Sequence, residues 1–328
     1  MSVSTRPRLL GLAVILAACA VAAVLTLQDI RLASSQTVTL IARRSEEAIP
    51  LDDPSASVWK RAAAVEVPLS AQNVVPPMAG GDAKVTARAL HDGDRLYIRL
   101  EWRDDAQDTS TIGQTEFADA AAVQFPVVVG EQVPPFCMGD PNAPVNIWQW
   151  KASWQTAVDD GFVQIEEAFP NTVVDLYPFE DEDVFYPSRA AGNILARTDR
   201  TTPVDNLLAG SFGTLSEATD QMIEGRGEWD DGRWRVVFAR DLEVTGEYTQ
   251  FAVDGRTDLA FAVWDGDQGQ RDGMKSVSRF LSLDISSEIA KESGGPPAIV
   301  IGMAIVAGLA ALLLLALGYL AYYRRRGA

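Results

Sequence analysis

Residues 84–102 read Lys84-Val85-Thr86-Ala87-Arg88-Ala89-Leu90-His91-Asp92-Gly93-Asp94-Arg95-Leu96-Tyr97-Ile98-Arg99-Leu100-Glu101-Trp102, and they decide the fold class. Two runs suited to strands, 84–90 and 95–102, flank a segment that contains Asp-Gly. An Asp-Gly pair between alternating runs is a strong β-hairpin signal, because glycine accepts the positive φ of a tight turn. Strand side chains alternate between faces. One face of the second run therefore carries Leu96, Ile98, Leu100 and Trp102.

The same signals recur along the chain. Residues 225–229 and 233–239 flank Asp231-Gly232 and predict a second hairpin. Further strand patterns cover residues 119–129, 259–264 and 275–285, whereas helical patterns are confined to short pieces near 146–156 and 215–223. Many short strands separated by turns predict a mainly β protein with an antiparallel β-sandwich.

Long apolar runs lie near both chain ends, at residues 9–27 and 298–323. A membrane-spanning helix needs about 20 such residues, so the second run predicts a transmembrane helix. Arginines flank the outer side of each run, at Arg6, Arg8 and 324–326. Because cytoplasmic flanks are rich in Lys and Arg, we expect both termini in the cytoplasm and the main domain on the periplasmic side of the cell membrane.

The first apolar run has three interpretations. It is an uncleaved membrane anchor, a cleaved signal, or a lipoprotein signal whose cleavage box, Leu16-Ala17-Ala18-Cys19, would leave a lipidated Cys19. The chain accordingly divides into an anchor or signal (1–28), a lead-in segment (29–75), a β-sandwich domain (76–290), a linker (291–297), a transmembrane helix (298–323) and a basic cytoplasmic tail (324–328).

Composition excludes several classes of function. A net charge of −17 argues against a nucleic-acid partner, because few groups could neutralise phosphates. The two cysteines, Cys19 and Cys137, cannot form a four-cysteine zinc or iron–sulfur site. The single histidine, His91, and the absence of Cys-x-x-Cys-His mean that a haem, if bound, is non-covalent and not ligated by two histidines. His91 itself is expected to be exposed in its turn.

A methionine in a loop is the first candidate ligand. Pro134-Pro135-Phe136-Cys137-Met138-Gly139-Asp140 places Met138 between proline and glycine residues. A thioether is a soft ligand that suits haem iron and raises its reduction potential. The alternative is that Met138 fills a gap in the core. In the following segment, Trp148 and Trp150 could wall a flat cofactor.

A lysine in a strand pattern is the second candidate. Alternation from Lys275 to residue 285 puts it on the core-facing side of the predicted strand, with Val277, Leu281, Leu283 and Ile285. Burial disfavours the ammonium form and so frees a lone pair for a metal. The alternative is that Lys275 lies at the strand start and extends to solvent.

Four segments together resemble a known family. Residues 119–126, 135–139, 145–152 and 275–278 resemble the haem-b-binding gamma subunits of ethylbenzene dehydrogenase, dimethylsulfide dehydrogenase, and chlorate and selenate reductases. The resemblance covers roughly residues 76–285. It implies a β-sandwich that holds one non-covalent haem b between axial methionine and lysine ligands, which map onto Met138 and Lys275.

The resemblance also implies a function. We expect a membrane-anchored haem b electron-transfer subunit of a molybdopterin oxidoreductase complex, without substrate chemistry of its own. A molybdopterin catalytic subunit, an iron–sulfur subunit and a cytochrome c or quinone-linked carrier would be its partners. The substrate of the complex (nitrite, nitrate, chlorate, selenate, a sulfide or a hydrocarbon) stays open. The alternative is a haem-free extracytoplasmic binding or docking module resembling carbohydrate-binding sandwiches, with Trp148, Trp150 and Trp154 as a platform.

Overall fold

The computed structural model describes most of the chain between the two apolar runs. It covers residues 38–292 except 75, 77, 79, 82, 131–132, 136–137, 164–167, 174–186, 194–195 and 197. Both apolar runs, 9–27 and 298–323, lie outside these residues, so the predicted membrane helices do too. Within the described residues, none of the helices has the length and apolar character needed to cross a membrane.

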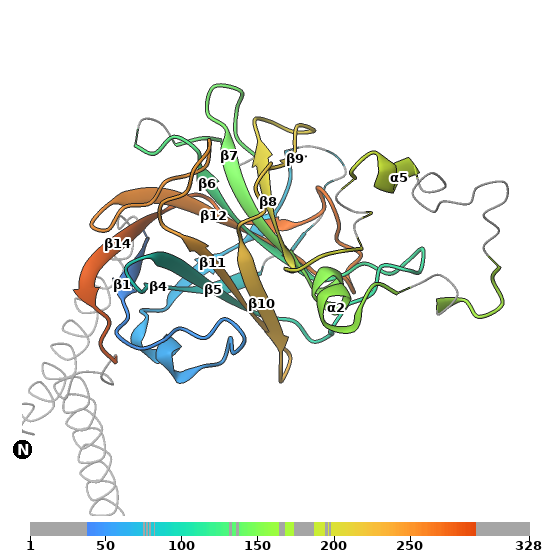
Figure 1. The fold of residues 1–328 in the computed structure, drawn as a ribbon, viewed down its shortest axis with the longest axis horizontal. Coiled ribbons are helices and arrows are strands. Elements are labelled where there is room, and N and C mark those ends of the chain that lie inside the picture. Colours follow the sequence, from blue (N-terminus) through green and yellow to red (C-terminus); the bar gives the residue numbers. More distant parts are fainter. Residues whose placement is uncertain are drawn as a thin grey trace, which may run out of the picture.

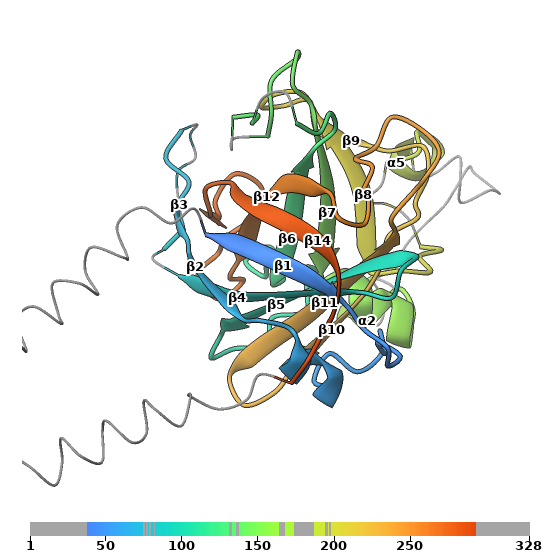
Figure 2. The ribbon, with the colours of Figure 1, turned by 90° about the vertical axis from the view of Figure 1, so that its left-hand side faces the viewer.

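One strongly bent sheet folds over itself to make both layers of a sandwich (Figures 1 and 2). Its strands follow the order β10 (Glu224–Trp229), β11 (Arg233–Asp241), β5 (Arg95–Arg103), β4 (Lys84–His91), β1 (Thr39–Arg44), β14 (Leu281–Ile289), β12 (Arg256–Trp264), β6 (Ala120–Pro126), β7 (Val145–Lys151), β8 (Val204–Ala209) and β9 (Ser216–Glu217). β2 (Val65–Pro68) pairs with β4, and β13 (Ser276–Val277) pairs with both β12 and β3 (Ser70–Ala71).

The sheet passes from one layer to the other at β12. The first half of this strand pairs with β14, and its second half, from Ala260 onward, pairs with β6. β1 runs parallel to both of its neighbours, β4 and β14. The sheet therefore contains both parallel and antiparallel pairs, which corrects the prediction of a purely antiparallel sandwich. β1 and β2 also show that residues assigned to a lead-in segment supply strands of the same sheet.

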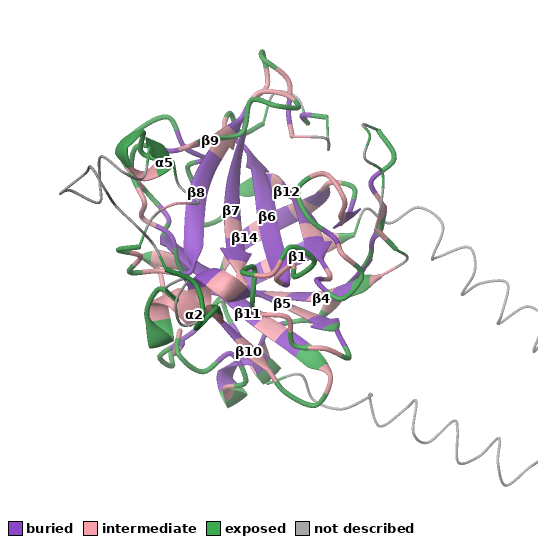
Figure 3. Cartoon of the chain, turned by 90° about the vertical axis from the view of Figure 1, so that its right-hand side faces the viewer, coloured by how far each residue is buried: buried purple, intermediate pink, exposed green. Residues whose placement is uncertain are grey.

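Aromatic side chains fill the space between the layers. Trp150 of β7 packs edge-on against Trp102 of β5 and Trp234 of β11, with ring centroids 6.5 and 4.9 Å away. Trp148 packs at a tilt against Phe125, at 4.7 Å, and edge-on against Phe251, at 5.9 Å. Such pairs contribute about 0.5–1.5 kcal/mol each beyond the burial of apolar area. Figure 3 shows β6, β7 and β8 as mostly buried strands.

Both predicted hairpins are confirmed. β4 and β5 pair around the Asp92-Gly93 turn, and β10 pairs with β11 around Asp231-Gly232. The apolar face of β5 points into the core as the alternation indicates, and its members are Leu96, Ile98, Leu100 and Trp102. These signals are local, since turn chemistry and alternation act over a few residues.

Of the two predicted helices, the one near 146–156 is partly correct and the one near 215–223 is wrong. Residues 145–151 form strand β7, and only then does helix α2 (Ala152–Asp160) begin. Pairing with β6 and β8 on either side outweighs the helical pattern there. Residues 215–223 hold the short strand β9 and turns, because hydrogen bonds tie them to β8. The amide of Ala218 donates to the carbonyl of Asn206 (2.9 Å), and the side chain of Gln221 accepts from the amide of Asn206 (2.7 Å).

The predicted strand 275–285 is two strands. β13 ends at Val277 and pairs with the second half of β12, whereas β14 begins at Leu281 and pairs with its first half. Leu281, Leu283 and Ile285 lie in the core between the layers. Lys275 belongs to the outer face of the other layer instead. The register that placed it with those core residues was wrong.

His91 is buried, not exposed. One of its ring nitrogens, Nε2, lies 2.9 Å from the carbonyl oxygen of Ser286 on β14. The amide of Ser45 donates to the carbonyl of His91, so the chain that follows β1 covers the end of the hairpin. The long-range pairing of β1 therefore buries a residue that the turn pattern places at the surface.

Candidate functional site

A cavity of about 590 Å³ lies on the outer face of the layer made by β12, β6, β7 and β8, beneath the loops that cover it. Strand alternation sends every second side chain of this layer into the cavity. The cavity-facing residues on three strands are Ala120, Ala122 and Gln124, then Ile147, Gln149 and Lys151, then Ala260, Ala262 and Trp264. Small-molecule and cofactor sites commonly have volumes of about 300–1,000 Å³.

Alanines make part of the cavity floor flat. Ala122 of β6 and Ala262 of β12 are paired residues, so two methyl groups lie side by side on this face. Ala120 is paired with Trp264 next to them. Small side chains leave open, apolar space above the strands, which suits a broad planar ligand. The sequence Ala120-Ala121-Ala122 thus supplies both faces of its layer, with Ala120 and Ala122 at the cavity and Ala121 packed in the interior.

Met138 lies in the loop between β6 and β7 and lines this cavity. Its side chain is half-buried against the apolar cluster that includes Ala122 and Ile147. Its φ is 67°, in the left-handed region that costs a side chain with a Cβ about 1–2 kcal/mol. The amide of Gly139 donates to the carbonyl of Pro135 (3.2 Å) and helps to hold the turn. Backbone strain of this kind concentrates at functional sites.

Lys275 lies just before β13 and lines the same cavity. Its Nζ is 5.0 Å from the ring centroid of Trp264. The carbonyl of Lys275 accepts a hydrogen bond from the amide of Gln72 (2.9 Å). A Cβ at position 80 would lie only 2.3 Å from the carbonyl oxygen of Lys275, so Gly80, with φ of 125°, permits a close approach there. Two neighbouring segments therefore fix the backbone that carries this amine.

The two candidate ligands approach the cavity from opposite ends of the strands. Met138 follows the carboxyl end of β6, whereas Lys275 is next to Ser276, which pairs with Val263 near the carboxyl end of β12. Because β6 and β12 are antiparallel, those two ends are far apart along the sheet. A ligand bound between them would meet a thioether from one side and an amine from the other.

Lys151 is a cavity residue that the sequence analysis missed. It ends β7 and pairs with Ala120, so it lies at the same end of the cavity as Lys275. Burial lowers its pKa, and the nearby carboxylates of Asp205 and Asp272 partly oppose that shift. Its Nζ lies 4.5 Å from the ring centroid of Trp154. Alternation with Ile147 and Gln149 is the signal that could have found it.

Trp148 and Trp150 do not reach the cavity. Both side chains are fully buried on the inner face of β7, in the aromatic core between the layers. This placement corrects the prediction that they wall a cofactor, and its cause is again alternation, since Ile147, Gln149 and Lys151 take the outer face. It also removes them from the proposed carbohydrate platform. Of the three tryptophans considered, only Trp154 lines the cavity.

The thioether of Met138 and the amines of Lys151 and Lys275 surround one cavity on a β-sandwich. This is the arrangement expected of a cofactor-binding domain. The family model described as ethylbenzene dehydrogenase matches residues 56–276, more than half of the chain. The chain belongs to this family.

Three curated relatives are similar over most of their length. A protein of Haloferax mediterranei, provisionally named a respiratory nitrate reductase heme subunit, is 31% identical over 80% of this chain and 82% of its own. Chlorate reductase subunit gamma of Ideonella dechloratans is 28% identical over 69% of this chain and 75% of its own. Dimethylsulfide dehydrogenase subunit gamma of Rhodovulum sulfidophilum is 27% identical over 69% and 72%, respectively.

Among solved structures, a family 9 carbohydrate-binding module of Caldicellulosiruptor kristjanssonii in complex with cellotriose aligns with 79% of this chain and 98% of its own. The TM-score is 0.37 and the identity is 7%.

Proposed function

We propose that this chain is the haem b electron-transfer subunit of a multisubunit oxidoreductase, with the haem in the cavity on the outer face of β6, β7 and β12. The observation that carries the proposal is that Met138 and Lys275 line one cavity and enter it from opposite ends. The relatives named as a heme subunit and as gamma subunits of reductases and a dehydrogenase support the same conclusion.

The residues that line the cavity fit a haem. The alanine floor and the side chain of Ile147 offer apolar contact to a planar macrocycle, and Met138 and Lys275 offer one soft and one nitrogen ligand. At the edge of the cavity, the exposed guanidinium of Arg271 stacks on Phe117 at 4.3 Å and could pair with a propionate. Bound here, the haem iron would take up and release single electrons. Methionine ligation favours a high reduction potential.

The chain's own groups set the conditions for ligation. An amine binds iron only through its free lone pair, so Lys275 must lose its proton when the site is filled. Enclosure by an apolar ring system disfavours the ammonium form and assists that loss. Met138 needs no deprotonation, and the backbone that carries its thioether is held in a turn by the hydrogen bond from Gly139 to Pro135.

The assembly that we propose is held at the membrane. Residues 298–323 would anchor the ectodomain, which would lie on the periplasmic side, close to the bilayer. A molybdopterin catalytic subunit and an iron–sulfur subunit would exchange electrons with this chain, and a cytochrome c or quinone-linked carrier would connect it to the respiratory chain. The acidic surface, with a net charge of −17, would suit a basic carrier.

The proposal predicts one non-covalent b-type haem per chain. The measurement is pyridine haemochrome analysis of the full chain purified from cells supplied with haem precursor, with haem extraction into acidic acetone as the test of covalent attachment. We expect a b-type spectrum, full extraction and a stoichiometry of about one. A colourless protein, or haem that stays with the protein after extraction, would contradict the proposal.

A further inference from the structure

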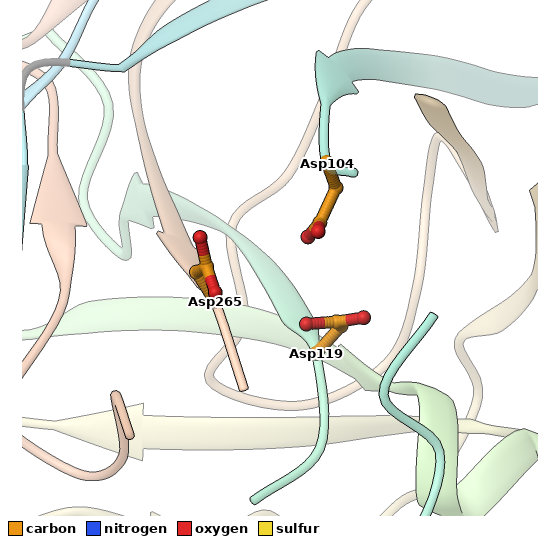
Figure 4. A group of neighbouring side chains, drawn as sticks. All are labelled: Asp104, Asp119 and Asp265. Atoms are coloured by element: carbon orange, nitrogen blue, oxygen red, sulfur yellow. The ribbon is translucent and has the colours of Figure 1, made fainter. Parts of the chain in front are cut away.

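Three aspartates from separate strands meet at one end of the sandwich. Asp104 directly follows β5, Asp119 directly precedes β6, and Asp265 directly follows β12. One carboxylate oxygen from each lies within 4.8 Å of the others, and the carboxylates converge on one point (Figure 4). Asp104 and Asp119 are buried and Asp265 is half-buried. The cluster joins the two layers, because β5 belongs to one and β6 to the other.

Asp119 is held in place by N–H donors. Its Oδ2 accepts from the amide of Asp108 (2.8 Å) and from the indole of Trp234 (2.9 Å), while its Oδ1 accepts from the amide of Gly266 (2.9 Å). Three N–H donors favour the ionised form of Asp119, whereas burial raises the pKa of this carboxyl group to about 7. The donors fix the position of the carboxyl group, with two further carboxyl groups within reach.

Asp104 contributes a buried oxygen to the cluster. Its residue is only 5% exposed, and its Oδ1 accepts from the amide of Ala106 (3.2 Å). Its Oδ2 makes no hydrogen bond of good geometry among the described residues, although the Trp102 side chain interacts with this carboxyl group. A buried oxygen that lacks a partner costs about 1–3 kcal/mol, and more when it is charged. Figure 4 shows the Asp104 carboxyl pointing toward Asp119. Burial, together with the charge of Asp265, raises the pKa of Asp104 to about 6.

We propose that these three carboxylates bind one calcium ion. Calcium binds oxygen ligands at about 2.3–2.6 Å, so pairs of its ligand oxygens lie up to about 5 Å apart, and the separations in this cluster, all within 4.8 Å, fall inside that range. Magnesium demands near-ideal octahedral geometry at about 2.0–2.1 Å, which favours calcium here. The three candidate ligands are all oxygens, which does not favour zinc or copper. Water and backbone oxygens would complete the shell.

The ion would tie together the two loops that frame the cavity. The loop from Asp104 to Asp119 contributes Thr111, Phe117 and Ala118 to the cavity, and the loop from Asp265 leads to Lys275. The loops already touch at Gly266, where a Cβ would lie 1.9 Å from the carbonyl oxygen of Phe117. An effect of calcium on haem retention rests on the proposed function, whereas calcium binding itself does not.

The test uses the full chain after treatment with EGTA. Isothermal titration with calcium chloride is expected to show one site per chain. At saturation we expect the melting temperature to rise by about 5–10 °C. Asp104→Asn keeps the side-chain shape and is expected to weaken calcium binding at least tenfold. The matched control is Asp105→Asn, which changes an adjacent, exposed carboxylate and should leave binding unchanged.

The outcomes separate the two proposals. The calcium site is overturned if the wild-type chain neither binds calcium nor melts at a higher temperature in its presence. It is also overturned if the Asp104→Asn and Asp105→Asn variants bind calcium with equal affinity. If Asp104→Asn does not fold, as judged by circular dichroism, Asp265→Asn replaces it, with the same expected loss of binding. A third outcome is a chain that binds calcium but takes up no haem, whether it is loaded with calcium or treated with EGTA. That outcome supports the ion site and contradicts the haem function.

Discussion

The Met138→Ala variant is expected to fold, to lose the spectrum of thioether-ligated haem, and to have a midpoint potential lower by on the order of 0.1 V. Ligand identity moves haem potentials across about 0.8 V, and methionine lies at the high end. Alanine cannot coordinate iron, so water or another side chain would take the position. The measurement is a spectroelectrochemical redox titration of the full chain.

Two companion variants sharpen this test. Met138→Gly removes the same ligand but relieves the left-handed backbone at φ 67°, so its haem-free chain should have a free energy of unfolding about 1 kcal/mol higher than that of Met138→Ala. Met274→Ala removes a nearby thioether that is not among the cavity-lining residues, and it should leave the spectrum and potential unchanged. A Met138→Ala protein with the wild-type spectrum and potential would show that this methionine is only a packing residue.

Lys275→Ala is expected to convert a six-coordinate, low-spin haem to a high-spin form, or to lose the haem. The cause is loss of the axial amine at the end of the cavity opposite Met138. Absorption spectroscopy and electron paramagnetic resonance of the oxidised protein measure the spin state. The control is Lys151→Ala, which removes the other amine at the same end of the cavity and should keep the low-spin spectrum.

Both lysines at this end of the cavity lie over a tryptophan ring, Lys151 over Trp154 and Lys275 over Trp264. Burial lowers the pKa of Lys151, although the charges of Asp205 and Asp272 oppose that shift. The choice of Lys275 as the ligand rests on the resemblance of residues 275–278 to the family, and the Lys151→Ala control tests that choice. The assignment would have to be reversed if Lys151→Ala became high-spin while Lys275→Ala stayed low-spin.

The parts of the fold that depend on local pattern could be predicted from the sequence. The hairpins β4–β5 and β10–β11, and the apolar face of β5, follow from alternation and turn chemistry. The position of β1 could not be predicted, because it pairs with β14 from the other end of the described residues and in a parallel direction. The passage of β12 from one layer to the other is also a long-range property. Neither feature produces a recognisable pattern within a short stretch of sequence.

The site could be predicted in part, and the errors share one cause. Met138 stands out because a thioether between proline and glycine residues has no periodic apolar face to explain it. Lys275 lines the cavity, but the strand register used to support it was wrong, because residues 275–285 divide into β13 and β14. Trp148 and Trp150 were placed on the ligand side, although alternation puts Lys151 there. Which face of a strand is open to a ligand depends on the layer behind it.

The most direct measurement is a crystal structure of the haem-loaded chain or of its native complex. The account predicts a porphyrin in the cavity over Ala122 and Ala262, with iron bonded to Sδ of Met138 and to Nζ of Lys275. A porphyrin located elsewhere, or iron bonded to any other pair of side chains, would contradict it.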